Sequence, residues 1–209
     1  MSLCEDSKFF NENLYIKIDK LILPEICNEL IKKYEQFSFD NSIEVTSKKI
    51  TDECSNIIST KKINTILSKY FKLDYKIFWS SFDVVKSNAL ENNPSTLWHL
   101  DGGSVKTLKL FIYLNPVSIH GGNTLIVDQN RTKVLRDVGA LPIEQEKRKL
   151  DLSSTLQELK LDTSTLSYDY EAGSALLFSP LLLAHRCLPP KNNQKRYTIC
   201  FTIVSIRKL

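Results

Sequence analysis

The residues best suited to metal chemistry are a histidine and an aspartate two positions apart. His99 and Asp101 occur in the sequence Trp-His-Leu-Asp, and the whole chain has only three histidines. On a β-strand, residues at positions i and i+2 project from the same face. An imidazole and a carboxylate side by side can supply two adjacent ligands to one metal ion, and a third must then come from elsewhere in the chain.

His185, which follows a predicted strand, is the candidate for that third ligand. Two histidines and one carboxylate leave the other coordination positions of a metal open. Such a set suits an Fe(II) ion that must also bind a co-substrate and O2. The set contains no thiolate, which disfavours a structural zinc site.

A polar face on the last predicted strand, residues 196–206, provides the second chemical feature. Alternation places Arg196, Thr198 and Cys200 on one face, which is expected where a sheet lines a polar cavity. A guanidinium offers a two-pronged donor to a carboxylate, and Thr198 adds a hydroxyl donor. Lys195 must point to the opposite face, and we choose Arg196 as the clamp because Thr198 continues its face. A metal with open positions beside such a clamp describes a site for a keto-acid co-substrate.

The predicted strand 107–114 adds two further candidates. Leu108 and Leu110 fall on one face of this strand, whereas Lys109 and Tyr113 fall on the other. Both side chains could line the same cavity as the clamp. A solvated lysine and a packed tyrosine explain the same pattern equally well.

Each motif also has a purely structural interpretation. His99 and Asp101 could form a hydrogen-bonded pair in a core, and His120, beside two glycines, is expected in a turn rather than at a metal. Cys187, two residues after His185, could be a nucleophile if a base lay nearby, although buried inert thiols are the common case.

The composition is that of a globular protein. Of the 209 residues, 42% are hydrophobic and 25% charged, which excludes a disordered or coiled-coil chain. The net charge of +4 is too small to require nucleic acid or an anionic membrane as a partner. The 5 scattered cysteines fit reduced thiols, and no apolar run has signal-peptide or membrane-spanning length, so we expect a cytoplasmic protein.

Helices are predicted early in the chain and strands later. The strands are expected at residues 14–18, 75–85, 107–114, 124–127, 173–178 and 196–206. One helix should begin at Pro24 with the apolar face Ile26, Leu30, Ile31, Tyr34 and Phe37, and another should cover residues 62–71. Residues 131–160 are charged and helix-prone, which indicates an insertion that is either a solvated helix or a lid over the site. Trp98 should point away from the metal into the core. This order suggests an α+β, mainly β domain.

Several segments together resemble the Fe(II)/2-oxoglutarate-dependent dioxygenases, and within them the phytanoyl-CoA dioxygenase-like branch. The resemblance rests on WHLD at 98–101, TLKLFIYL at 107–114, HGGN at 120–123 and the stretch from GSALLFSP to KRYT at 173–198. It implies a double-stranded β-helix of the jelly-roll or cupin-like type, backed by N-terminal helices. The implied organisation is a single domain over residues 1–209, with helical support at about 1–74, a β-helix core at about 75–209 and a helical insertion at about 131–160.

The resemblance also implies a set of roles for the site residues. His99, Asp101 and His185 would bind Fe(II), while Arg196, helped by Thr198, would bind 2-oxoglutarate. The implied reaction uses O2 to hydroxylate an unactivated C–H bond of a small organic molecule, with succinate and CO2 as co-products. The alternatives are a peptidyl, prolyl-type hydroxylase and a non-catalytic sensor that binds metal and 2-oxoglutarate.

Three departures from the family pattern affect these expectations. Lys195 stands where prolyl-hydroxylase-like relatives use a lysine clamp. Thr202 replaces a second arginine of the nucleic-acid dealkylases, so a nucleic-acid substrate is not expected. Residues 128–131, Asp-Gln-Asn-Arg, replace a serine–histidine pair that often follows the glycine turn, so local substrate contacts should differ.

Overall fold

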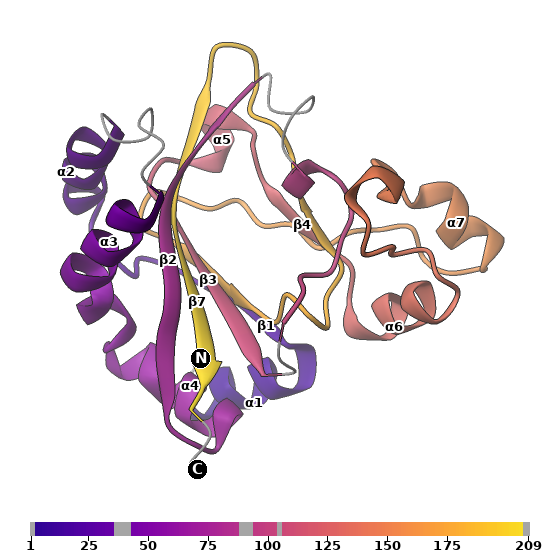
Figure 1. Ribbon diagram of the computed structural model, residues 1–209, viewed down its shortest axis with the longest axis horizontal. Coiled ribbons are helices and arrows are strands. Elements are labelled where there is room, and N and C mark those ends of the chain that lie inside the picture. The colour runs from indigo at the N-terminus through magenta and orange to yellow at the C-terminus, as the bar shows by residue number, and fades with distance from the viewer. Residues whose placement is uncertain (1–2, 36–42, 88–93, 104–105, 207–209) are drawn as a thin grey trace.

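Two antiparallel sheets form the framework of the computed structural model, which describes residues 3–35, 43–87, 94–103 and 106–206 (Figure 1). The strands are β1 (Tyr15–Ile18), β2 (Tyr75–Lys86), β3 (Thr107–Tyr113), β4 (Thr124–Ile126), β5 (Ala175–Phe178), β6 (His185–Cys187) and β7 (Lys195–Ser205). The helices are α1 (Leu3–Asn13), α2 (Pro24–Tyr34), α3 (Ile43–Ile58), α4 (Lys61–Phe71), α5 (Val117–His120), α6 (Gln129–Asp137) and α7 (Ser153–Glu158), with 3₁₀ turns at Pro94–Thr96 and Gln145–Lys147.

The larger sheet has five strands in the order β1-β5-β3-β7-β2, and the smaller sheet pairs β4 with β6. Every pairing between these strands is antiparallel. The last strand, β7, therefore lies inside the larger sheet, between β3 and β2. The result is a mixed helix-and-sheet structure dominated by antiparallel sheet, in agreement with the predicted α+β class.

The two faces of the larger sheet differ in the way the alternation predicts. On β3, Leu108, Leu110 and Ile112 are fully buried in the main hydrophobic core. On β7, Ile199 and Phe201 join the same core. The opposite face of both strands carries the polar and aromatic side chains, including the predicted site residues, so the sheet separates core from site.

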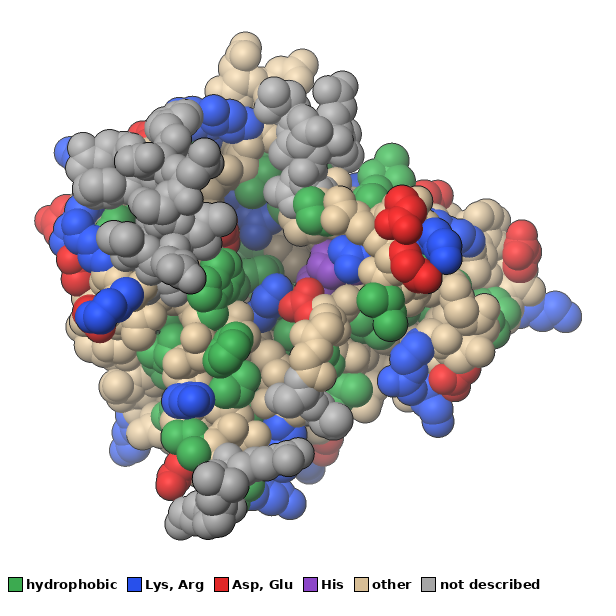
Figure 2. Space-filling view, viewed as in Figure 1, with side chains coloured by type: hydrophobic (Ala, Val, Ile, Leu, Met, Phe, Trp, Pro, Cys, Tyr) green, Lys and Arg blue, Asp and Glu red, His purple; other side chains and the backbone are tan. Residues whose placement is uncertain are grey.

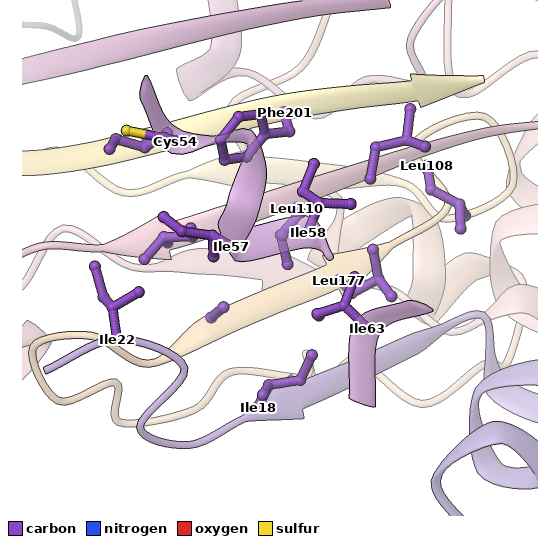
Figure 3. Close-up of a cluster of buried hydrophobic side chains, with 14 of the residues drawn as sticks. Ile18, Ile22, Cys54, Ile57, Ile58, Ile63, Leu108, Leu110, Leu177 and Phe201 are labelled. Atoms are coloured by element: carbon purple, nitrogen blue, oxygen red, sulfur yellow. The ribbon is translucent and has the colours of Figure 1, made fainter. Parts of the chain in front are cut away.

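Helices α3 and α4 cover the apolar face of this sheet (Figure 1). Figure 3 shows Ile57 and Ile58 of α3 on the side of the sheet that carries Leu110 and Phe201, and Ile63 of α4 beside Leu177. Burial of such side chains removes apolar surface from water and is the main force that holds helices to a sheet. The N-terminal helices thus act as a backing that keeps the sheet rigid behind the site.

Helix α2 begins at Pro24 as predicted, and Leu30, Ile31 and Tyr34 of its predicted apolar face pack against the core, but Ile26 does not. Ile26 is 41% exposed, whereas Cys27 and Tyr34 are buried. Cys27 and Tyr34 are seven residues apart and therefore lie on one side of a helix with 3.6 residues per turn, while Ile26 lies about 100° away from Cys27. Phe37, predicted on the same face, is outside the described residues. Helices α1 and α3 were not predicted.

Two α-helices and a 3₁₀ turn occupy the segment predicted as a helical insertion. Their apolar side chains form a separate core with Trp98, which is 4% exposed and packs as predicted. Helices α6 and α7 lie on the side of the molecule away from α1–α4 (Figure 1). Among the described residues, no helix has the length and apolar character needed to cross a bilayer.

Candidate metal centre

His99 and His185 are direct neighbours across two antiparallel segments. The backbone N–H of each donates to the carbonyl of the other, at 3.1 Å and 3.0 Å. Their ring centroids lie 4.3 Å apart, and both side chains are buried. Backbone pairing therefore brings together two histidines that are far apart in sequence.

Both imidazole rings are held in the same tautomer. His99 Nδ1 lies 2.7 Å from the Leu97 carbonyl oxygen, and His185 Nδ1 lies 3.0 Å from the Leu183 carbonyl oxygen. Because a carbonyl can only accept, each Nδ1 must carry the proton that it donates. In the neutral ring, the lone pair is then on Nε2. Fixing the tautomer through the outer nitrogen in this way is typical of metal-binding histidines.

Asp101 completes the cluster. Its Oδ1 lies 3.5 Å from His99 Nε2 and 3.7 Å from His185 Nε2. One ligand atom from each of the three residues lies within 4.8 Å of the other two. Three electron-pair donors facing one another repel unless a cation lies between them, so the donor chemistry fits a metal ion.

The protonation states of His185 and Asp101 also suit metal binding. Burial, followed by the adjacent His99, lowers the pKa of His185 to about 3, which leaves the ring neutral at pH 7. Burial alone would raise the pKa of Asp101, but its contacts with His99, His185 and Lys109 outweigh burial and hold that pKa well below the ordinary value. His185 is thus a neutral imidazole and Asp101 an ionised carboxylate at pH 7.

Lys109 projects from β3 into this cluster. Its Nζ lies 2.6 Å from Asp101 Oδ2, the carboxylate oxygen that is not shared with the histidines. Both side chains are about one-fifth exposed. Lys109 therefore faces the cavity, as one of the two sequence-based interpretations held, and its partner is the aspartate.

Arg196 and Thr198 lie on the same wall, on β7. Both are buried, and neither Arg196 Nε nor Thr198 Oγ1 has a hydrogen-bond partner among the described residues. The guanidinium contacts Cys187 Sγ and lies over the rings of Phe111 and Tyr113, at 5.8 Å and 5.3 Å from their centres. Buried donors without acceptors are costly, so this pair is built to receive an anion that carries oxygen atoms.

Lys195 points away from this wall, in agreement with the predicted strand register. Its Nζ lies 2.6 Å from Glu35 Oε1 on the other side of the sheet. Tyr113, in contrast, is on the cavity side, where its hydroxyl donates to Thr124 Oγ1 at 2.7 Å. Tyr113 is also stacked on Tyr170. Tyr113 thus contributes an aromatic floor beneath Arg196.

The two remaining candidates have structural environments. His120 is fully buried, accepts a hydrogen bond from the Gly122 N–H at 2.9 Å and lies in the predicted turn region, outside the metal cluster. Burial raises the pKa of the Cys187 thiol, which disfavours the thiolate that a nucleophile requires.

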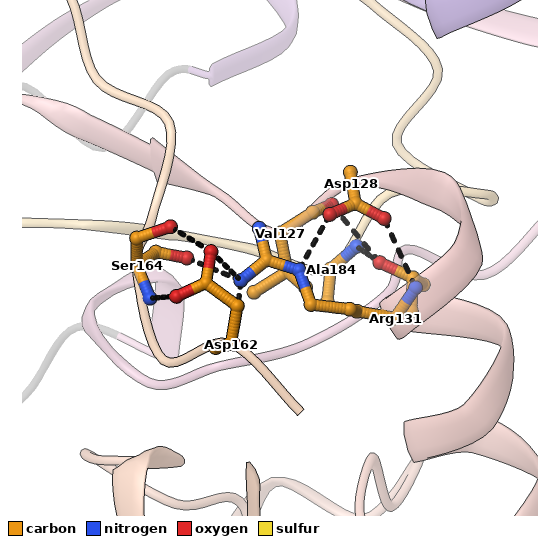
Figure 4. Close-up of polar contacts among 7 residues, drawn as sticks. Val127, Asp128, Arg131, Asp162, Ser164 and Ala184 are labelled. Atoms are coloured by element: carbon orange, nitrogen blue, oxygen red, sulfur yellow. Dashed lines mark hydrogen bonds and ion pairs between the residues drawn. The ribbon is translucent and has the colours of Figure 1, made fainter. Parts of the chain in front are cut away.

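A threonine hydroxyl of α6 bridges the two backbone segments next to His185, a contact that the sequence does not reveal. Thr132 Oγ1 accepts from the Ala184 N–H at 3.0 Å and donates to the Val127 carbonyl at 3.0 Å. Val127 and Ala184 lie next to each other in Figure 4. The first turn of α6 thereby anchors the residue that precedes the second histidine. Thr132 and Ala184 are far apart in the sequence, so no local pattern around either residue predicts this contact.

Arg131 and Asp128 have structural roles in place of the substrate contacts considered for residues 128–131. Asp128 caps α6 by accepting from the Arg131 N–H at 3.0 Å. The Arg131 side chain donates to Asp128 at 2.5 Å and to the carbonyls of Asp162 and Ser164 at 2.6 Å each (Figure 4). These contacts pin the helix to the loop that leads into β5.

The surface is hollowed near the cluster. Figure 2 shows a depression whose wall carries a histidine side chain, with acidic and basic side chains beside it. Both imidazoles of the cluster remain more than nine-tenths buried. The arrangement is a recessed site, open on one side, between the two sheets.

The fold matches that of known iron enzymes, although the sequence has diverged far from them. No protein-family model matches the sequence, and the comparison with curated proteins also finds no match. The epimerase SnoN in complex with Fe3+, α-ketoglutarate and nogalamycin RO has a TM-score of 0.67 at 9% identity, over 97% of this chain and 83% of SnoN. HygX from Streptomyces hygroscopicus with nickel and 2-oxoglutarate has a TM-score of 0.63 at 11% identity, over 96% of this chain and 86% of HygX.

A third similar structure has a different stated activity. The α-ketoglutarate-dependent carbocyclase SnoK from nogalamycin biosynthesis has a TM-score of 0.61 at 14% identity, over 96% of this chain and 83% of SnoK. The chain therefore shares the fold of non-heme α-ketoglutarate-dependent enzymes. At these identities the likeness concerns the fold, and the chemistry must be argued from the site.

Proposed function

We propose that this protein is an Fe(II)- and 2-oxoglutarate-dependent dioxygenase that hydroxylates an unactivated C–H bond of a small organic molecule. One observation carries the proposal. The same cavity holds three convergent metal-ligand atoms and, on its β7 wall, a buried guanidinium that forms no ion pair with a carboxylate among the described residues. The sequence resemblance supports a double-stranded β-helix of the phytanoyl-CoA dioxygenase-like type, formed by one domain.

The residues of this chain fit the two groups that the reaction requires. His99, Asp101 and His185 offer the two-histidine, one-carboxylate set that leaves positions open on Fe(II). Arg196 and Thr198 offer donors to the distal carboxylate of 2-oxoglutarate. When bound, iron and 2-oxoglutarate supply O2 activation and oxidation of a C–H bond, with succinate and CO2 as co-products.

The protein's own contribution is positional and electrostatic. The carbonyls of Leu97 and Leu183 hold the imidazole tautomers, and Lys109 holds one oxygen of Asp101. Tyr113 and Arg196 form the end of the pocket that is remote from Lys109 on β3. The separation of Lys109 and Tyr113 along β3 would thus match the two ends of 2-oxoglutarate: the keto-acid end at the metal and the distal carboxylate at Arg196.

The orientation of Lys195 argues against the prolyl-type alternative. A lysine clamp in that position would have to face the cavity, but Lys195 pairs with Glu35 on the opposite side of the sheet. SnoN binds a small molecule, nogalamycin RO, in its structure. Both points favour a small-molecule substrate for this chain over a peptide.

Turnover of 2-oxoglutarate tests the proposal. Purified protein is incubated with Fe(II), ascorbate, 2-oxoglutarate and O2, and succinate is measured against the variant Asp101→Ala. Slow succinate formation by the wild-type protein alone is expected, because such a site turns over without its primary substrate. Succinate at the level of Asp101→Ala would reject the enzyme. Tight 2-oxoglutarate binding without succinate would instead support the sensor alternative.

A further inference from the structure

A carboxylate that the proposed reaction does not use faces the site from β2. Asp83 lies opposite Thr198 in the β2–β7 register, and Ser81 lies opposite Cys200. Phe82, between them, points into the main core on the other side of the sheet. Strand alternation therefore places Asp83 on the cavity wall, beside the residues of the carboxylate clamp.

Asp83 has no cationic partner in this position. It accepts a hydrogen bond from Ser81 Oγ at 3.1 Å, and no lysine, arginine or histidine among the described residues forms an ion pair with it. Burial is the largest influence on the Asp83 carboxyl and raises its pKa, against the opposing effects of Ser81, Arg196 and Lys109. Burial disfavours the ionised form of this carboxyl group, so a ligand that brings a positive charge next to it would stabilise the carboxylate.

The two nearby cations are committed elsewhere. Lys109 pairs with Asp101 at 2.6 Å, and Arg196 contacts Cys187 and is the clamp for 2-oxoglutarate in the proposed function. Arg196 forms no ion pair with Asp83 and acts on it only through space, and a co-substrate carboxylate bound to Arg196 would cancel that favourable effect. The loaded cavity then contains one acidic group without a counter-charge, on the wall beside the clamp.

We propose that Asp83 binds a protonated amino group of the primary substrate, so the substrate class is an amine-bearing small molecule. This assignment rests on the proposed function, because that function commits Arg196 to the co-substrate. The carboxylate would accept a charge-assisted hydrogen bond from the ammonium, while Ser81 keeps its side chain oriented. Asp83 is thus a specificity residue that touches the substrate and takes no part in metal binding.

The test uses pairs of probes that differ in the amine. Protein loaded with Ni(II) and 2-oxoglutarate, which cannot turn over, is titrated with cyclohexylamine or cyclohexanol and with glucosamine or glucose. Binding is followed by saturation-transfer NMR, which detects millimolar affinities. The variant is Asp83→Asn, and the matched control is Asp52→Asn, which removes an exposed carboxylate from α3, behind the sheet.

The amine of at least one pair should bind wild-type protein and Asp52→Asn more tightly than its neutral counterpart. Asp83→Asn should weaken amine binding by roughly tenfold to hundredfold, as expected for loss of a charged hydrogen bond. It should fold normally, because it removes an uncompensated charge. Equal binding of amines and neutral compounds, or binding of neither, would overturn the proposal, as would amine binding unchanged in Asp83→Asn.

The same samples separate this proposal from the proposed function. Saturation transfer to 2-oxoglutarate reports the co-substrate site independently of the amine. If 2-oxoglutarate binds and amines show no preference, the substrate assignment fails and the oxygenase stands. If 2-oxoglutarate does not bind, the proposed function fails whatever the amines do.

Discussion

Lys109 Nζ lies 2.6 Å from Asp101 Oδ2, while Asp101 Oδ1 faces the Nε2 atoms of both histidines. The two oxygens of one carboxylate are thereby assigned different tasks. One is held by an ammonium, and the other would bind the metal in the proposed function. In the proposed function, the lysine would keep the carboxylate from rotating and from binding the metal through both oxygens, which would preserve open positions for a co-substrate.

Replacing Lys109 should weaken metal binding through the carboxylate. We expect Lys109→Met to lower Ni(II) or Fe(II) affinity by about ten- to hundredfold, the usual cost of losing a group that orients a ligand. Lys109→Arg should recover much of that loss because it keeps the charge. Chelator competition measures both. Unchanged metal affinity with weakened 2-oxoglutarate binding would instead make Lys109 a co-substrate ligand.

Removing either histidine of the cluster should abolish metal binding. His99→Ala and His185→Ala each delete one of three ligands, so metal content after reconstitution should fall to background. His120→Gln is the matched control, since His120 is buried but lies outside the cluster. Metal analysis of the three variants decides the matter, and wild-type occupancy in both alanine variants would disprove the ligand assignment.

Arg196 and its neighbour Lys195 should respond differently to replacement by alanine. Losing the buried Arg196 leaves a bound carboxylate uncompensated, at a typical cost of about 3–5 kcal/mol. Arg196→Ala should therefore weaken 2-oxoglutarate binding by roughly two to four orders of magnitude while metal binding survives. Lys195→Ala should leave 2-oxoglutarate binding unchanged, because its partner is Glu35. Calorimetric titration of both variants is the measurement, and the reverse result would refute the assignment.

His120 should make stability depend on pH. Burial, the largest effect, lowers its pKa to about 4 from the ordinary value of 6.5. Between these values the unfolded chain takes up a proton that the folded protein refuses, so stability falls as the pH drops from 6.5 toward 4. His120→Gln removes the His120 contribution to this dependence, which amounts to roughly 1–3 kcal/mol. Urea unfolding at pH 7 and pH 4.5 measures it; the same pH loss in both proteins would contradict the prediction.

Strand alternation allowed much of the site to be predicted from the sequence. The i, i+2 spacing placed Lys109 and Tyr113 on one face of β3, and Arg196 and Thr198 on one face of β7. The same rule correctly sent Lys195 to the other side of the sheet. Such predictions succeed because a pleated strand fixes side-chain direction locally, without knowledge of the partner strand.

What could not be predicted depends on contacts between distant segments. Nothing around Lys109 indicates that its partner is Asp101, because β3 and the loop with Asp101 meet only in the folded chain. Asp83 carries no local signal for a cavity, because it is a single acid in an aromatic-rich strand. Ile26 is predicted at the edge of the apolar face of α2, but the face that packs against the core is centred on Cys27, Leu30, Ile31 and Tyr34 and leaves Ile26 exposed.

The position of β7 has a consequence for how the protein is made. Residues 195–205 lie between β3 and β2 in the sheet, so neither neighbour can complete its pairing until this strand has left the ribosome. During translation, β3 and β2 are therefore synthesised before the strand that pairs with both of them. Such late, non-local closure slows folding and exposes aggregation-prone edges. We therefore expect ribosome-associated chaperones to bind the nascent chain until β7 is synthesised. Arg196 is part of β7, so the proposed clamp is completed at the same step as the sheet.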